Sequence, residues 1–191
     1  MRMFEDEPTR LPRSGADWEH HRKHRQPQAG PSQDEVGVLA MSSFVMVRGS
    51  EVAVAVQGVT AYSDGLVLHV VVLFADEQKQ ESLDWSLQEY SRSPGRFRLG
   101  VQSAGGQRAT TGTRDAPPVE TPSAGAVLTL QGSTSGPLRW LGDYWLWPLP
   151  DAGDLLVGVR WPDRGIEETL VRVDTSPLLA AAATSRPVWE S

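Results

Sequence analysis

The residues of this chain that could do chemistry begin with one isolated histidine. His69 stands between Leu68 and Val70, and the other three histidines lie together near the N-terminus. A general base or a metal ligand needs partner groups, and a single histidine does not supply them. We therefore interpret His69 as a surface residue or a hydrogen-bonded residue of a strand.

Six carboxylates near the expected hairpin ends are candidates for acid–base hydrolysis or for calcium binding: Asp143, Asp151, Asp154, Asp163, Glu167 and Glu168. None of them has the Asp-x-Asp spacing of a calcium loop. Aspartate is also common in turns, where its side chain bonds to the nearby backbone. We interpret these carboxylates as solvated turn residues, and a loop-borne carboxylate enzyme is the least favoured alternative.

Catalytic and cofactor-binding motifs are absent from the rest of the sequence. Residues 132–136, Gly-Ser-Thr-Ser-Gly, have the outline of a Gly-x-Ser-x-Gly nucleophile elbow, but the central residue is threonine and the strand–turn–helix context is missing. No glycine-rich nucleotide fingerprint occurs. Cysteine is absent, which excludes disulfides, zinc–thiolate sites and cysteine nucleophiles. The sequence predicts a loop at 132–136, no catalytic residue, no metal and no cofactor.

The last candidate is the aromatic segment 139–150, which holds three of the seven tryptophans and one of the three tyrosines. On a strand, alternate residues share a face, so Trp145 and Trp147 point opposite to Tyr144. The segment is either the centre of a core or a platform for flat ligands. We expect Trp145 and Trp147 to face inward, which leaves three aromatics as candidate ligand-binding residues: Trp140, Tyr144 and Trp161.

The net charge and the composition limit the classes of partner that the protein is expected to bind. The 191 residues carry a net charge of −6, so no general attraction to nucleic acid or to anionic membranes is expected. One exception is the basic run from His20 to Arg25, which could make a weak nucleic-acid contact. No secretory signal and no apolar run of about 18–20 residues is present. We expect a cytoplasmic protein whose partner is another protein.

The elements that must position these residues are mostly strands. Residues 1–35 lack periodicity and are predicted to be a disordered tail, and residues 36–191 to form one domain. Period-two alternation and glycine or proline turns predict eight or nine strands between 43 and 173. Segment 75–94 is a helix or a long excursion, and 111–125 a loop. Ser176-Pro177 predicts a short helix over 178–184.

This pattern predicts a mainly β protein, an antiparallel immunoglobulin-like β-sandwich with a short C-terminal helix and a disordered N-terminal tail. A closed or half-open barrel is the alternative. The aromatic segment is expected to form a hairpin with residues 155–161, through a turn at 151–154.

The run Tyr144-Trp145-Leu146-Trp147-Pro148-Leu149-Pro150, followed by Trp161-Pro162 and Gly165-Ile166, resembles a motif shared by a widespread group of actinobacterial proteins. The likeness covers about residues 45–190. It implies a high-GC bacterial origin and a single domain, but no activity that could be transferred. Because the sequence has no catalytic constellation but predicts a folded β body and a charged tail, we expect a non-enzymatic binding or protein-interaction module. The alternative is a β-sandwich that binds carbohydrate or another small ligand through surface aromatics.

Overall fold

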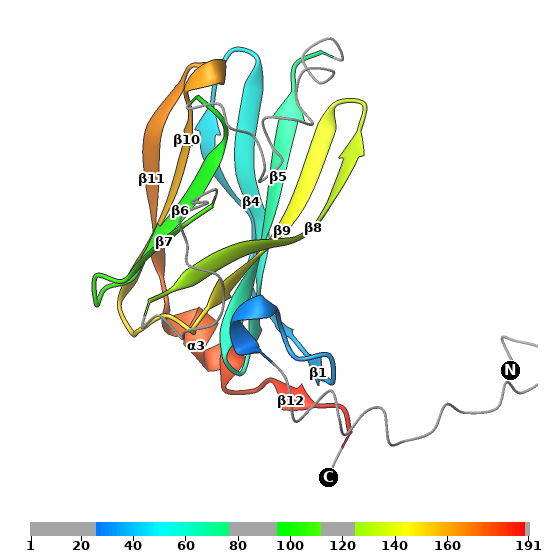
Figure 1. Cartoon of the computed structure of the whole chain (residues 1–191), viewed down its shortest axis with the longest axis vertical. Coiled ribbons are helices and arrows are strands. Elements are labelled where there is room, and N and C mark those ends of the chain that lie inside the picture. The colour runs from blue at the N-terminus through cyan, green and yellow to red at the C-terminus, as the bar shows by residue number, and fades with distance from the viewer. Residues whose placement is uncertain (1–25, 77–94, 112–124, 190–191) are drawn as a thin grey trace, which may run out of the picture.

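The computed structural model describes residues 26–76, 95–111 and 125–189. Their two larger antiparallel sheets pack face to face (Figure 1), and a third sheet has only two strands. The larger sheet has six strands, with β3 and β2 sharing one edge of β4: β2 (Val38–Met41), β3 (Phe44–Arg48), β4 (Val52–Tyr62), β5 (Gly65–Phe74), β9 (Arg139–Trp147) and β8 (Val127–Gly136). The smaller sheet has four: β11 (Ile166–Asp174), β10 (Asp154–Trp161), β6 (Arg98–Gln102) and β7 (Arg108–Thr110).

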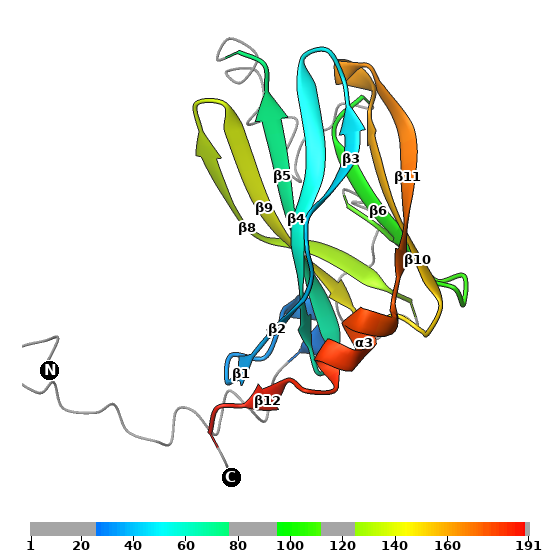
Figure 2. The same ribbon diagram turned by 180° about the vertical axis from the view of Figure 1, so that it is seen from behind.

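Short elements close one end of the sandwich. Helix α3 (Ser176–Ala182) packs on β2 and β4, and β1 (Glu35–Val36) pairs with β12 (Arg186–Pro187), as the view from behind shows (Figure 2). Two 3-10 turns, η1 (Pro27–Ala29) and η3 (Pro162–Arg164), complete the described part. The predicted antiparallel sandwich with a C-terminal helix is confirmed, whereas its immunoglobulin-like type stays a prediction.

The core lies between the sheets and follows the period of two that strands impose. On β4 and β5 the inward positions are occupied by apolar side chains that are almost completely buried: Val52, Val54, Val56, Leu66, Leu68, Val70 and Val72. Aromatic rings join the two sheets. The ring of Phe97 lies 6.4 Å from that of Trp140 and 5.4 Å from that of Trp161, between ring centres.

The predicted hairpin of residues 139–150 with 155–161 is wrong, because β9 and β10 lie in different sheets. Strand β9 pairs with β5 and β8, while β10 pairs with β6 and β11. Proline has no backbone N–H to donate, so ladder pairing stops where Pro148 and Pro150 follow β9. The chain uses residues 148–153 to cross from one sheet to the other.

The loop predicted at 132–136 is also wrong, since these residues form the second half of β8. They pair with β9 from Gly132 opposite Asp143 to Gly136 opposite Arg139. A bulge at Gln131 shifts the register just before them. The glycines and hydroxyl residues favour a loop by local preference, but the ladder with β9 overrides that preference.

Several predicted segments fall partly or wholly outside the described residues. These are residues 1–25 of the predicted tail, most of segment 75–94 and most of the loop 111–125. Residues 26–35, which the sequence assigns to the tail, contain η1 and the first residue of β1 in the structure. They lie against the outer face of the six-stranded sheet, where η1 contacts β9.

Candidate functional site

The candidate site lies on the outer face of the six-stranded sheet, which we define as the face turned away from the four-stranded sheet. The half of this face around Trp145, which we call the lower half, is covered by the segment around η1. The indole Nε1 of Trp145 donates a 2.8 Å hydrogen bond to the carbonyl oxygen of Pro27, and the Gln131 amide donates to the carbonyl of Ala29 at 2.9 Å. Trp145 is completely buried there. In the upper half, which includes β3 and the end of β5, Val45 and Leu73 are each 46% exposed.

At the border between the two halves, three side chains from three strands form a hydrogen-bonded chain. Nδ1 of His69 lies 2.7 Å from Oδ1 of Asp143, and its Nε2 lies 2.8 Å from the hydroxyl oxygen of Thr60. The cross-strand register explains the first contact, because His69 on β5 stands directly opposite Asp143 on β9. With hydrogen on Nδ1, the imidazole donates to the carboxylate and accepts from the hydroxyl.

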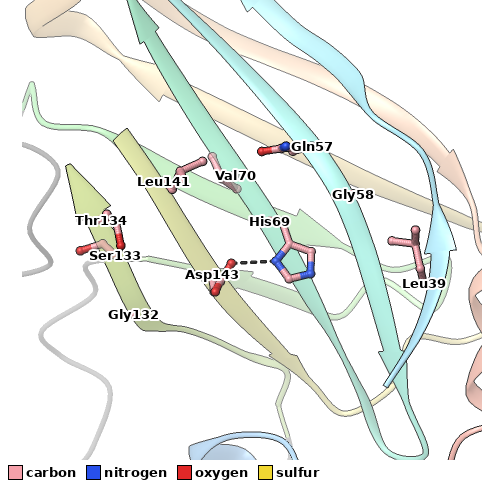
Figure 3. A pocket seen from close by; sticks show the side chains of 10 residues that line it. All are labelled: Leu39, Gln57, Gly58, His69, Val70, Gly132, Ser133, Thr134, Leu141 and Asp143. Carbon is pink, nitrogen blue, oxygen red and sulfur yellow. Dashed lines mark hydrogen bonds and ion pairs between the residues drawn. The ribbon is translucent and has the colours of Figure 1, made fainter. Parts of the chain in front are cut away.

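A groove of about 590 Å³ opens beside this chain (Figure 3). Apolar walls are supplied by Leu39 on one side and Leu141 on the other, and the His69–Asp143 pair lies between them. Gln57 and the hydroxyl residues Ser133 and Thr134 add hydrogen-bonding groups. The volume falls within the range of about 300–1,000 Å³ that is usual for small-molecule sites.

Backbone irregularities concentrate around the groove. Strand β4 is bulged at Gln57, opposite His69, and β8 is bulged at Gln131, opposite Asp143. A bulge adds one residue to a strand and increases its local twist, which re-aims the neighbouring side chains. The two bulges therefore flank the His69–Asp143 pair, at the place where the groove lies.

The hydroxyl–imidazole–carboxylate order is the one that activates a nucleophile in hydrolases. Two features of the site bear on that chemistry. Thr60 does not line the groove, and a Cβ on Gly37 would lie 2.5 Å from its methyl group, so the chain packs over it. The hydrogen bonds orient His69 and thereby hold Asp143, whose side chain is 55% exposed, at the groove floor.

The pKa of a tyrosine beside the three hydrogen-bonded side chains is shifted by its surroundings. Tyr62 packs edge-on against Trp145, with ring centres 5.8 Å apart. Burial raises the pKa of the Tyr62 phenol above its usual value of 10.0, and the carboxylates of Glu35 and Asp143 raise the pKa further. The phenol therefore stays neutral across the physiological range and adds a hydrogen-bonding group to this face.

The three aromatics predicted to bind a ligand lie in the core. Trp140, Tyr144 and Trp161 are 4%, 2% and 0% exposed, so they present no surface to a ligand. The predicted orientation of β9 is inverted: Trp140 and Tyr144 point inward, and Trp145 points outward. Because both faces of this strand are apolar, alternation separates the two sets without telling which one is inside.

The acidic candidates are spread over the molecule. Asp143 lies on the outer face of the large sheet, while Asp154 forms a 2.7 Å ion pair with Arg172 across β10 and β11. Across the described ranges, no group of three or more histidine, cysteine, aspartate or glutamate side chains is placed to hold a metal ion. Of the six carboxylates, only Asp143 lines the groove.

The sequence contains a weak signal for His69 and Asp143 as individual residues, but none for their contact. His69 is the only polar residue between Leu66 and Phe74, and Asp143 is the only acidic residue of the aromatic segment. Each interrupts an apolar strand on its outward side. Their contact depends on the register of β5 with β9, across a separation of 74 residues.

Comparison with known proteins adds no assignment. No family model, no curated protein and no solved structure matches the chain significantly. In the part of the chain that the structure describes, no helix is long and apolar enough to cross a membrane.

Proposed function

We propose that this chain is a non-enzymatic binding module of the cytoplasm of a high-GC bacterium, and that its partner is another protein. The partner binds the upper half of the outer face of the six-stranded sheet. The basic run at residues 20–25 lies outside the described residues and has no part in the proposal.

The observation that carries the proposal is an apolar row on this face. Val45, Ala55, Val71 and Leu141 stand opposite one another on β3, β4, β5 and β9. Val45 is 46% exposed, Ala55 and Leu141 are partly buried, and Val71 is 7% exposed. Next to this row, Leu73 is 46% exposed. A sheet face that meets only water is normally polar, and an exposed apolar patch marks an interaction site.

The test places a charge in this patch and compares it with the same change elsewhere. Leu73→Glu lies on the proposed face, and Leu170→Glu, at a residue 56% exposed on β11, is the matched control. Stoichiometric partners are captured from native lysate, and their affinities are then measured with purified proteins. Leu73→Glu should weaken binding about tenfold or more, which corresponds to about 1.4 kcal/mol.

Two results would contradict this proposal. One is equal affinity of the wild type and Leu73→Glu for the captured partner, which would place binding elsewhere. The other is the absence of any stoichiometric partner whose capture depends on the outer face. Circular dichroism of each variant shows whether a loss of binding reflects unfolding.

A second candidate is binding of a hydroxyl-rich small ligand, such as a saccharide, in the groove. The observation that favours it is the combination of apolar walls with the carboxylate of Asp143 and the amide of Gln57, since hydroxyl groups need such donors and acceptors. A glycan panel read by calorimetry tests it. Binding should be lost in Asp143→Ala. It should be kept in the control variant Glu168→Ala, because Glu168 is exposed on β11, away from the groove.

A further inference from the structure

The exposed edge of the six-stranded sheet is formed by β8. The strand pairs with β9 on one side, and it is the last strand of the sheet on the other (Figure 1). Residues 131–135 are exposed, and the strand residues on either side of them, Leu130 and Gly136, are partly buried. An edge strand presents unpaired backbone N–H and C=O groups, which are a template for pairing with another chain.

Strand β8 lacks the features that usually block such pairing. Its ten residues include no charged side chain and no proline. The edge strand β11 of the other sheet carries Glu167, Glu168 and Arg172. The opposite edge of the large sheet is divided between β2 and β3, and contacts α3 and β11. Among the described strands, β8 is therefore the long edge strand without charged side chains. The one feature of β8 that could hinder pairing is its bulge at Gln131.

We propose that β8 pairs antiparallel with β8 of a second copy of this chain, so that two six-stranded sheets join into one. Self-pairing places residues of one short segment opposite residues of the same segment. A charge in that segment would face its own copy, and like charges opposite each other are destabilising. The segment 132–134 is Gly-Ser-Thr, which is uncharged and small, and Ser and Thr hydroxyls can bond across a strand pair.

The second copy would also complete the groove. Gly132, Ser133 and Thr134 form its rim on the β8 side, where the sheet ends. The two-fold axis of an antiparallel strand pair stands perpendicular to the sheet, so both outer faces lie on the same side. With strands about 4.8 Å apart, three spacings place the two Asp143 carboxylates about 15 Å from each other.

This inference does not depend on the proposed partner, although it would make the module bivalent. Two outer faces side by side could bind two linked sites on one partner, which raises the overall affinity without a new contact. Dimer formation and partner binding are measured separately, so failure of one leaves the other standing.

The experiment measures the mass of the full chain by sedimentation equilibrium over a wide concentration range. We expect the wild type to reach twice the 20.9 kDa of one chain. Thr134→Lys and Thr134→Glu should each be monomeric, because each puts like charges across the two-fold axis. An equimolar mixture of the two variants should recover the dimer, which a folding defect would not allow.

The matched control is Thr169→Lys, which adds the same charge to the edge strand β11. It should remain as dimeric as the wild type. A wild type that stays at 20.9 kDa at every concentration would overturn the inference. So would a Thr134→Lys variant that dimerises like the wild type, a Thr169→Lys variant that dissociates, or a Lys–Glu mixture that stays monomeric.

Discussion

Replacing Trp145 with alanine should destabilise the fold far more than replacing Trp147 two residues along the same strand. Trp145 is 0% exposed, covered by η1 and packed against Tyr62. Trp147 is only partly buried. Removing a large buried aromatic costs about 3–5 kcal/mol through lost burial and the cavity left behind. We expect the Trp147→Ala change to cost less than half as much.

A conservative variant separates the hydrogen bond from the packing. Trp145→Phe keeps an aromatic ring against Tyr62 but loses the Nε1–H that binds the carbonyl of Pro27 at 2.8 Å. A hydrogen bond contributes about 0.5–1.5 kcal/mol net, so Trp145→Phe should lie between the wild type and Trp145→Ala. The same variant should loosen the η1 segment.

The assay is urea denaturation followed by circular dichroism. With an m-value of about 2–3 kcal/mol per molar urea, the Trp145→Ala change should lower the midpoint by about 1–2 M. Hydrogen exchange of residues 26–36 reports the release of η1 in Trp145→Phe. Equal midpoint shifts for Trp145→Ala and Trp147→Ala would refute the orientation of β9 and the covering role of η1.

Two further predictions concern the groups around the groove. The pKa of Tyr62 is raised in the folded state, so the contribution of its phenol to stability is complete below pH 10.0 and is lost as the pH rises through the folded-state pKa. The Tyr62→Phe variant has no phenol to ionise. In urea titrations above pH 10.0 it should therefore lose less stability than the wild type. The hydrogen-bonded chain of Thr60, His69 and Asp143 is assigned a positioning role, so the wild type and Thr60→Val should hydrolyse p-nitrophenyl acetate at the same rate. A slower variant, with its fold intact by circular dichroism, would indicate a nucleophilic threonine.

Local patterns in the sequence were sufficient to predict the fold class. Alternation in 52–56 and 155–161, and the Asp64-Gly65 turn, depend on neighbours two to four residues apart. The chain folds these segments as β4, β10 and the β4–β5 hairpin. The helix after Ser176-Pro177 follows from equally local rules. Such features need no knowledge of distant contacts.

The candidate site could not be predicted in the same way, because each of its parts depends on a distant partner. The sequence marks His69 and Asp143 as isolated polar residues in apolar strands, yet only the pairing of β5 with β9 brings them to 2.7 Å. A shift of that register by one residue would move Asp143 to the other face.

The sequence by itself therefore determined the strands, the turns, the C-terminal helix and the apolar character of β9. The tertiary structure decided which face of β9 is the core, which sheet β9 joins and what covers Trp145. The physical reason is that a period of two divides a strand into two sets of side chains but assigns neither set to the inside. That assignment comes from the packing of Trp140 and Tyr144 against the second sheet, and of η1 over Trp145.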